Sequence, residues 1–331
     1  MRKLYYQVRS NHEWVESMRD FSNSTIAYLG PRGTFTEEAL RSQSDLARAR
    51  LIPYPSWAAV MEAVDKREVD YGFVAIENSI EGTVSATIDP LIFDYDLFVI
   101  REVIHDVHLN LMTLSGVRMD QIRKVMSYPH ALAQCRGFLA DNLPEAEIVA
   151  TNSTSDAAKI VAEGDDRSLA ALAPAASAEL YHLEILKKHV EDHAGNQTRF
   201  LLLNKDHLAP RTGHDKTTVV CFQLSDRPGS LISILAQFSA RNINLTKLES
   251  RPSKTGLGQY CFVIDLEGHI EDPIVADTLS ELYISQPEIK LIGSYPAARA
   301  GSKGNADSLK ERSAEAESWL SGLLSRIERL V

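Results

Sequence analysis

Short runs of apolar and β-branched residues alternate with amphipathic segments from residue 25 onward. This alternation predicts an α/β fold with largely parallel strands. The first set of elements consists of strands over 25–30, 51–54 and 71–77 and helices over 36–44 and 56–66. Such a density of βαβ units leaves room only for short loops.

A second set of the same kind covers residues 124–183. It consists of strands over 124–128, 147–151 and 168–174 and helices over 130–142, 153–163 and 175–183. An extended β-branched stretch over 96–114 precedes this set, and a strand over 198–205 follows it. Two such crossing strands predict two α/β lobes that are joined by a hinge and enclose a cleft.

The last third of the chain predicts a second domain. Residues 206–213 are polar, with Pro and Gly, and indicate a linker between a domain over 25–205 and a domain over 214–296. The order strand, helix, strand, strand, helix, strand in the second domain is the ferredoxin-like βαββαβ arrangement. Residues 1–24 are an N-terminal extension. The tail over 297–331 predicts an amphipathic helix with an apolar face made of Ala316, Leu320, Leu323, Ile327 and Leu330.

Charge and cysteine usage exclude several kinds of partner. The chain has 35 Lys and Arg against 45 Asp and Glu, a net charge of −10, which disfavours nucleic acid and anionic membranes. No apolar run approaches the length of a membrane span, and the N-terminus lacks the apolar core of a secretory signal. Cys135, Cys221 and Cys261 lie far apart, which indicates neither disulfides nor a zinc site and favours a cytoplasmic location.

The sequence contains no dinucleotide, P-loop, zinc-hydrolase or serine-hydrolase motif. It contains loops rich in hydroxyl and amide groups, which follow predicted strands and open helices. Free backbone N–H groups then face the edge where open α/β sheets bind ligands, and a small anion carrying carboxylates is the expected ligand. A role as helix N-cap alone is the commoner one for any single loop. The loops are 30–36, 77–87, 127–134 and 151–158, together with 196–200 at the second crossing.

These loops carry a family resemblance. The segments YLGPRGTFTEEAL, AIENSIEGTVSATIDPL, SYPHALAQC, NSTSDAA and NQTRFLLL, in that order, resemble prephenate dehydratase. KTTVVCFQLSDRPGSL and LESRP resemble its ACT regulatory domain. The resemblance implies a two-lobed catalytic domain of the periplasmic-binding-protein kind. It further implies conversion of prephenate to phenylpyruvate, with loss of water and carbon dioxide, in phenylalanine biosynthesis and without cofactor or metal.

The resemblance also implies roles for individual residues. Thr198 would give a proton to the leaving hydroxyl, and Phe200 is expected in the core. Arg199 could pair with a substrate carboxylate or with a protein acid, and the sequence favours neither. The other catalytic candidates are Asn78, Ser127 and Gln134. The substrate-binding candidates are Thr34, Thr36, Glu77, Ser79, Ser153, Thr154 and Asn196.

Alternatives remain for several of these side chains. Glu77 could be a general acid if burial raised its pKa, but a carboxylate that accepts hydrogen bonds from loop N–H groups is the commoner outcome. Tyr128 and His130 stand where many members of the family have His and Gln, so His130 is expected at the rim of the cleft. An N-cap role is equally compatible with four hydroxyl residues, namely Thr34, Thr36, Ser153 and Thr154.

The C-terminal domain carries a predicted effector site. The turn over 226–229 leads into a helix N-terminus, which suits the carboxylate of an amino acid. The resemblance implies that this turn and the ESRP segment bind phenylalanine at an interface between domains. Ser230 and Ile232 replace the family's Ala and Val and leave the ligand preference open. The candidates are Asp226, Pro228, Gly229, Ser230, Leu231, Ile232, Glu249, Ser250, Arg251 and Pro252.

Two other functions compete with a prephenate dehydratase inhibited by phenylalanine. An arogenate dehydratase would perform the same elimination on the aminated substrate, and no residue separates the two. A non-catalytic sensor of an aromatic metabolite would need no proton donor, so NQTRF argues against it. Exposed edges of a βαββαβ unit suit pairing with a second copy, and a homodimer or homotetramer is expected.

Overall fold

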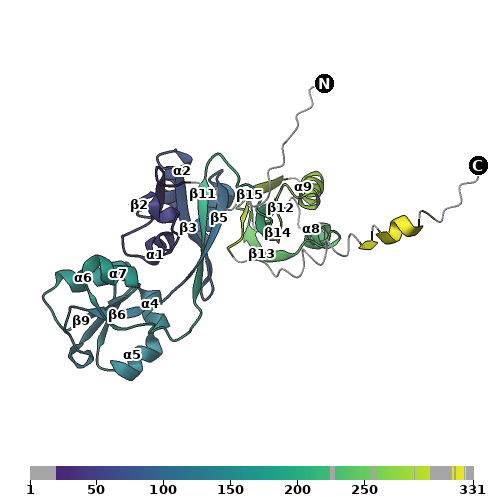
Figure 1. The fold of residues 1–331 in the computed structure, drawn as a ribbon. Helices are drawn as coiled ribbons and strands as arrows, with labels where there is room; N and C mark the ends of the chain where they lie inside the picture. Colours follow the sequence, from purple (N-terminus) through teal and green to yellow (C-terminus); the bar gives the residue numbers. More distant parts are fainter. Residues whose placement is uncertain are drawn as a thin grey trace, which may run out of the picture.

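The computed structural model describes residues 20–223, 228–254, 256, 258–286, 288–298, 315–316, 318–323 and 325. Figure 1 shows a first α/β lobe in the middle, a second lobe that hangs from it, and a C-terminal domain on the opposite side. Among the described residues, no helix is long and apolar enough to cross a membrane.

The first lobe is built on a mixed sheet with the strand order β5-β11-β3-β1-β2. Strand β1 pairs in parallel with β2 and β3, as the sequence predicts, but β11 is antiparallel to both β3 and β5. The strands are β1 (Thr25–Leu29), β2 (Arg50–Tyr54), β3 (Tyr71–Asn78), β5 (Phe98–Asp106) and β11 (Gln197–Asn204), and β4 (Gly82–Thr83) pairs with β3.

Helices α1 (Phe35–Arg41), α2 (Trp57–Asp65) and α3 (Ser85–Phe93) pack on this sheet, with a 3-10 turn over Leu46–Arg48. Helix α2 begins where the Ser56 side chain accepts a hydrogen bond from the Ala59 N–H, an N-cap. Phe200 is 2% exposed, and its ring stacks on that of Phe73. The expected place of Phe200 in the core is confirmed.

The second lobe has a five-stranded sheet with the order β10-β6-β9-β7-β8. Its strands are β6 (Asn110–Thr113), β7 (Lys124–Ser127), β8 (Glu147–Ala150), β9 (Leu169–Ala173) and β10 (Glu184–Lys187). Its helices are α4 (Pro129–Gln134), α5 (Arg136–Asn142), α6 (Thr154–Glu163) and α7 (Ala175–Tyr181), with a 3-10 turn over Met119–Gln121. The single helix predicted over 130–142 is wrong, because it breaks at Cys135. The Asp192 carboxylate binds the N–H groups of Gly137 and Phe138 and starts α5 anew.

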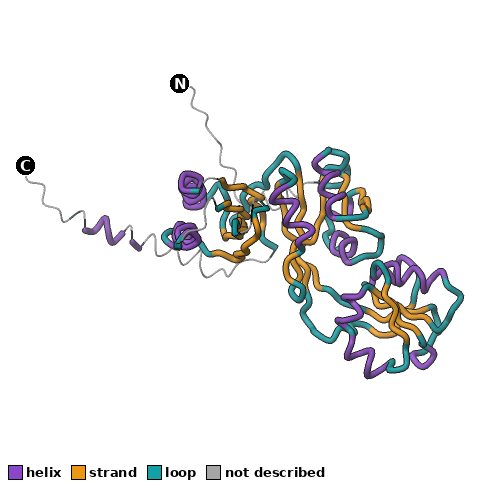
Figure 2. The backbone as a smooth tube through the Cα atoms, turned by 180° about the vertical axis from the view of Figure 1, so that it is seen from behind, coloured by secondary structure: helices purple, strands orange, loops and turns teal. Residues whose placement is uncertain are grey.

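Two neighbouring crossings join the lobes, one between β5 and β6 and one between β10 and β11. Figure 2 shows both running from the first lobe to the second. Their backbones are hydrogen-bonded, since the Val107 N–H donates to the Asn196 carbonyl at 2.8 Å. The predicted two-lobed α/β fold is confirmed.

The C-terminal domain has the predicted βαββαβ order. Its elements are β12 (Asp215–Phe222), α8 (Ser230–Ser239), β13 (Leu245–Pro252), β14 (Tyr260–Glu267), α9 (Pro273–Ser285) and β15 (Glu288–Pro296). The antiparallel sheet has the order β13-β14-β12-β15, and α8 and α9 lie on the side that faces away from the lobes (Figure 1). Val219, Phe238 and Ile264 belong to the core between sheet and helices.

The other face of this sheet packs on the first lobe. Val220, Val263 and Tyr295 are buried in the same apolar cluster as the core of that lobe. Strand β15 pairs with β5 at Gly293 and Val99, so one ten-stranded sheet runs through both units. A Cβ atom at Gly293 would lie 2.5 Å from the Val99 carbonyl oxygen, so this close approach requires glycine.

The two ends of the chain are described only in part. Residues 318–323 are helical, in agreement with the predicted tail helix, and Leu320 and Leu323 are partly exposed there. Ile327 and Leu330, together with residues 1–19 of the N-terminal extension, lie outside the described residues.

Candidate active site

Thr198 lies at the start of β11, where the second crossing enters the first lobe. Its backbone pairs with Asn78 on β3 and with His105 on β5, and opposite residues in antiparallel strands share one face of the sheet. The Asn78 side-chain amide donates to Thr198 Oγ1 at 3.0 Å and to Asn196 Oδ1 at 2.8 Å. The threonine and both asparagines therefore form one hydrogen-bonded group.

Asn78 is held in a fixed orientation. Its Oδ1 accepts hydrogen bonds from the backbone N–H groups of Ile80 and Glu81, at 2.9 and 3.1 Å. This Asx turn leaves the amide NH₂ to face Thr198. Because Thr198 Oγ1 accepts from Asn78, its own hydrogen can point at a ligand.

The same group reaches the second lobe. The Asn196 amide donates to Gln134 Oε1 at 3.0 Å, from the second crossing to helix α4. The Gln197 N–H donates to Ser79 Oγ at 2.9 Å. The structure thus brings together candidates that lie far apart in the sequence, namely Asn78, Ser79, Gln134, Asn196 and Thr198.

His130 lies beside this group at the surface. Its side chain is 58% exposed, and its Nδ1 lies 2.9 Å from Glu81 Oε1. Gln134 also contacts Glu81, at 3.4 Å. The position fits the predicted rim of the cleft.

A second contact between the lobes involves the loop over 30–36. Ser177 Oγ on α7 donates to the Gly33 carbonyl at 2.7 Å, and Ser155 on α6 donates to the Arg32 carbonyl. Gly33 has φ +80°, and a Cβ atom there would lie 2.9 Å from Ser155 Oγ. Glycine therefore lets this loop approach the second lobe.

The hydroxyl candidates divide into different roles. Ser153 is the N-cap of α6, since its Oγ accepts from the Asp156 N–H at 2.9 Å. Thr34 precedes α1 without a side-chain cap, and Thr36 and Thr154 are buried. Ser127 is fully buried and donates to the Leu172 carbonyl at 2.6 Å. These hydroxyls are not part of the hydrogen-bonded group around Thr198.

Arg199 points to the opposite face of the sheet, toward the C-terminal domain. Its Nη1 donates to Asp265 Oδ2 at 2.6 Å, and its Nη2 donates to the Tyr295 hydroxyl at 3.0 Å. Its Nε also forms an ion pair with Glu102, whose side chain is fully buried. Of the two predicted alternatives, the structure has the pairing with protein acids.

Burial and charge pairing shift the pKa values of Glu102 and Arg199 in this cluster. Burial favours the neutral form of Glu102, but Arg199 and Lys216 outweigh it and hold the pKa of this carboxyl below its usual value. Desolvation favours the neutral form of Arg199, but Tyr295, Asp265 and Glu102 outweigh it and raise the pKa of the guanidinium. Glu102 and Arg199 are therefore both ionised at neutral pH.

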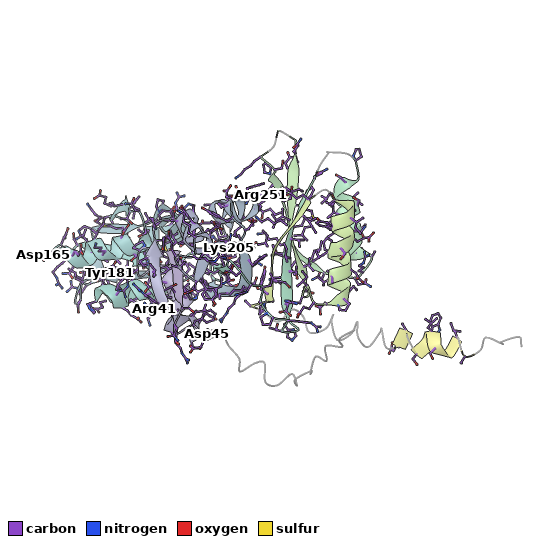
Figure 3. All side chains as sticks on the ribbon, turned by 90° about the horizontal axis from the view of Figure 1, so that it is seen from above. Arg41, Asp45, Asp165, Tyr181, Lys205 and Arg251 are labelled. Carbon is purple, nitrogen blue, oxygen red and sulfur yellow. The ribbon has the colours of Figure 1, made fainter. Side chains whose placement is uncertain are left out.

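Alternate residues of β13, namely Lys247, Glu249 and Arg251, face the first lobe. Lys247 Nζ lies 3.2 Å from Glu77 Oε2, so Glu77 pairs with this cation and not with the loop N–H groups that the sequence favoured. Thr83 Oγ1 donates to Glu249 at 2.7 Å, and Arg251 Nη1 donates to Ser85 Oγ at 2.9 Å. The view in Figure 3 labels Arg251 on this side of the C-terminal sheet. These contacts hold residues on both sides of Asn78 against the C-terminal domain.

The other effector candidates face away from the lobes. Ser250 and Pro252 alternate with the inward residues of β13 and are exposed. Gly229 precedes α8 with φ +88°, a conformation that favours glycine, and Ile232 is 72% exposed. Leu231 packs in the domain core and Ser230 contacts Gln223. Pro228 is exposed at the start of the described range 228–254, and Asp226 lies outside the described residues.

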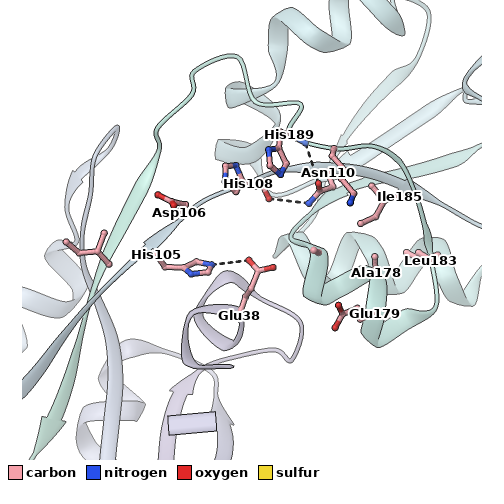
Figure 4. A pocket seen from close by; sticks show the side chains of 13 residues that line it. Glu38, His105, Asp106, His108, Asn110, Ala178, Glu179, Leu183, Ile185 and His189 are labelled. Atoms are coloured by element: carbon pink, nitrogen blue, oxygen red, sulfur yellow. Dashed lines mark hydrogen bonds and ion pairs between the residues drawn. The ribbon is translucent and has the colours of Figure 1, made fainter. Parts of the chain in front are cut away.

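A cavity of about 790 Å³ lies beside the crossings (Figure 4). His105 Nε2 lies 3.2 Å from Glu38 Oε2 within it, on the same face of the sheet as Thr198. Sequence reasoning missed this pair, because neither residue belongs to one of the polar loops. Only the register of β5 against β11 could have placed His105 next to Thr198.

Two family models match the chain. The model for prephenate dehydratase matches residues 26–208, and the model for the ACT domain matches residues 217–282. The chain belongs to the prephenate dehydratase family. The prediction of a carbon–oxygen lyase is thereby confirmed.

Individual members of the prephenate dehydratase family cover most of the chain. A prephenate dehydratase of Mycolicibacterium vanbaalenii is 40% identical, over 90% of this chain and 97% of its own length. That of Amycolatopsis methanolica is also 40% identical, over 83% of this chain and 89% of its own. The crystal structure of the Arthrobacter aurescens enzyme in complex with L-Phe superposes with a TM-score of 0.78 at 37% identity. The superposed region covers 91% of this chain and 99% of the Arthrobacter aurescens chain.

Proposed function

We propose that the chain converts prephenate into phenylpyruvate between its two lobes, with Thr198 as proton donor to the leaving hydroxyl. The observation that carries this proposal is the hydrogen bond from the Asn78 amide to Thr198 Oγ1. It orients the threonine hydroxyl in a group that spans both lobes. A cleft formed by two lobes is where a small ligand can meet groups from both halves of the protein.

The reaction needs a proton at the leaving oxygen and no oxidant or reductant. The electron pair of the bond between the ring and its carboxylate enters the ring, carbon dioxide leaves, and the ring hydroxyl departs with a proton as water. Because a threonine hydroxyl is a weak acid, Thr198 relays a proton and does not ionise: Oγ1 takes a proton from a water molecule as its own proton passes to the leaving hydroxyl, and the water is left as hydroxide. The Asn78 N–H stabilises the partial negative charge on Oγ1 during this transfer.

The two carboxylates of prephenate require hydrogen-bond donors. Ser79, Gln134 and Asn196 offer neutral hydroxyl and amide groups close to Thr198. Neutral donors can hold an anion without the burial of opposing fixed charges. Thr34, Thr36, Ser153 and Thr154, on the loops that open helices in both lobes, are further candidates, and backbone N–H groups of these loops would assist them.

Arg199 acts as a positioning residue in this proposal. Its guanidinium contacts Asp265, Glu102 and Tyr295, which holds the backbone next to Thr198. We replace its predicted catalytic role by this one. Ser127, which donates to a carbonyl in the second lobe, supports the site through the packing of β7 against β9.

We further propose feedback inhibition by phenylalanine through the domain over 214–296, with a linker over 206–213 and a catalytic domain over 25–205. The matched ranges 26–208 and 217–282 support this division. The edge position of β13 and the exposed face of α8 support assembly into a homodimer or homotetramer. Three free, buried cysteines favour a cytoplasmic location.

The test is incubation of the full chain with prephenate and, separately, with arogenate. Formation of phenylpyruvate from prephenate is expected. Conversion of arogenate alone, into phenylalanine, would favour the aminated substrate. Absence of turnover on both, together with phenylalanine binding, would instead indicate a sensor.

A further inference from the structure

Two histidines and a glutamate meet where the crossings reach the second lobe. His108 lies on the first crossing, and His189 and Glu191 lie on the second. One possible ligand atom from each of the three lies within 4.8 Å of those of the other two. His108 Nδ1 is 2.8 Å from Glu191 Oε1, and the two imidazole rings lie parallel with centroids 3.9 Å apart. Figure 4 shows both histidines at the wall of the cavity.

The backbone fixes these side chains relative to each other. The Val190 N–H donates to the Leu109 carbonyl at 2.8 Å, and the Leu109 N–H donates to Glu191 Oε2 at 2.9 Å. The Glu191 carboxylate is only 7% exposed, whereas the His108 side chain is 43% exposed. A buried carboxylate thus faces two imidazoles that solvent can reach.

The chemistry of this group suits a divalent cation. Two imidazoles and one carboxylate are donors that zinc uses, at about 2.0–2.2 Å each, and three protein ligands leave a position open. Donor atoms around such an ion lie about 3–3.5 Å apart, so the imidazole of His189 or His108 must turn out of its stack on the other for both to face the ion. Three carboxylates and one lysine also line the cavity and give it a negative balance, namely Glu38, Asp106, Glu179 and Lys188.

We propose that His108, His189 and Glu191 form a site for a first-row divalent cation of the zinc class. The bound ion links the first crossing to the second and stiffens the hinge between the lobes. Sequence reasoning did not find this site, since about eighty residues separate His108 from the other two ligands and no short-range metal-binding spacing results. The expectation of a chain without metal followed from the cysteines and from the family resemblance.

The experiment titrates Zn²⁺ into the full chain by calorimetry, after removal of metals. One ion per chain is expected to bind. His189→Ala and His108→Ala should each weaken the affinity about tenfold or more, since loss of even an outer ligand partner costs that much. The matched control is His193→Ala, an exposed histidine four residues from His189 in the same connection, which should bind Zn²⁺ like the parent.

A second measurement separates a specific site from surface binding. Co²⁺ in place of Zn²⁺ should give the visible absorption of an ion with nitrogen ligands in the parent and in His193→Ala, and not in His189→Ala. Zn²⁺ should raise the melting temperature of the same two proteins only. Absence of binding to the parent, or binding that His189→Ala and His108→Ala leave unchanged, would overturn the proposal.

Discussion

Arg199 Nη1 donates to Asp265 Oδ2 at 2.6 Å and so ties the residue after Thr198 to the C-terminal domain. Successive residues of a strand face opposite sides of the sheet. Thr198 therefore shares a face with Asn78 and His105, while Arg199 reaches the other domain. A displacement of β14 would act on the strand that carries the proposed proton donor. Under the proposed function, we expect this contact to couple the C-terminal domain to Thr198.

Replacement of Asp265 tests this coupling. Asp265→Asn leaves the buried Arg199 charge with fewer partners, and loss of one partner of a buried ion pair costs about 3–5 kcal/mol. We expect lower stability in urea, a reduced kcat for prephenate with little change in KM, and a weaker inhibition by phenylalanine. Asp277→Asn, an exposed position on α9, is the control and should behave like the parent. An unchanged kcat in Asp265→Asn would refute the positioning role.

Substitution of Gly293 tests the contact between β15 and β5, where the sheet passes from the C-terminal domain to the first lobe. An alanine Cβ there would meet the Val99 backbone, with its oxygen 2.5 Å away, so β15 must move from β5. Overpacking of this kind costs about 1–3 kcal/mol or more. Gly293→Ala should lower the melting temperature and weaken the phenylalanine response. Gly256→Ala, where a Cβ meets nothing closer than 3.9 Å, is the matched control. Equal stability of the two variants would contradict the close approach.

The buried Glu102 predicts a loss of stability in acid. Its pKa lies below the usual 4.5 in the folded state, because Arg199 and Lys216 outweigh the desolvation by burial. The carboxylate therefore adds stability above about pH 4.5, and this contribution disappears as the pH falls through the folded pKa. Urea unfolding from neutral to acidic pH should show a shallower loss of stability in Glu102→Gln than in the parent. Parallel curves would exclude Glu102 as a source of the pH dependence.

Substitution of Ile232 tests whether the effector site lies at the exposed start of α8. If phenylalanine binds against the exposed start of α8, Ile232→Ala should weaken its binding about tenfold, because a buried Ile side chain contributes roughly 1.5–3 kcal/mol. Calorimetric titration with phenylalanine measures this effect. Ile274→Ala, a half-exposed apolar position on α9, is the control. Equal affinities in the two variants would move the effector site away from α8.

Much of the fold was predictable because the elements follow hydrophobic periodicity. The strands around Thr25 and Tyr71 and the βαββαβ order were found in this way. The break at Cys135 was not, because the group that caps the new helix, Asp192, comes from a distant segment. The continuous sheet through Gly293 was also missed, since it depends on the docking of two domains.

The candidate site was also predictable only in part. Asn78, Gln134 and Thr198 stand in polar loops that the sequence marks, and the structure brings them together. The direction in which Arg199 and Glu77 point depends on the C-terminal domain, which supplies Asp265 and Lys247. No local pattern contains that information, so the sequence left the partner of Arg199 open and favoured loop N–H groups as the partners of Glu77.

The most direct test of the account is kcat for prephenate in Thr198→Ala and Thr198→Ser, measured beside the parent. General acid catalysis typically contributes about a hundredfold to ten-thousandfold. Thr198→Ala should therefore lower kcat by about a hundredfold or more, whereas Thr198→Ser keeps the hydroxyl and should lose far less. A kcat of Thr198→Ala equal to that of the parent would contradict the proposed role of Thr198.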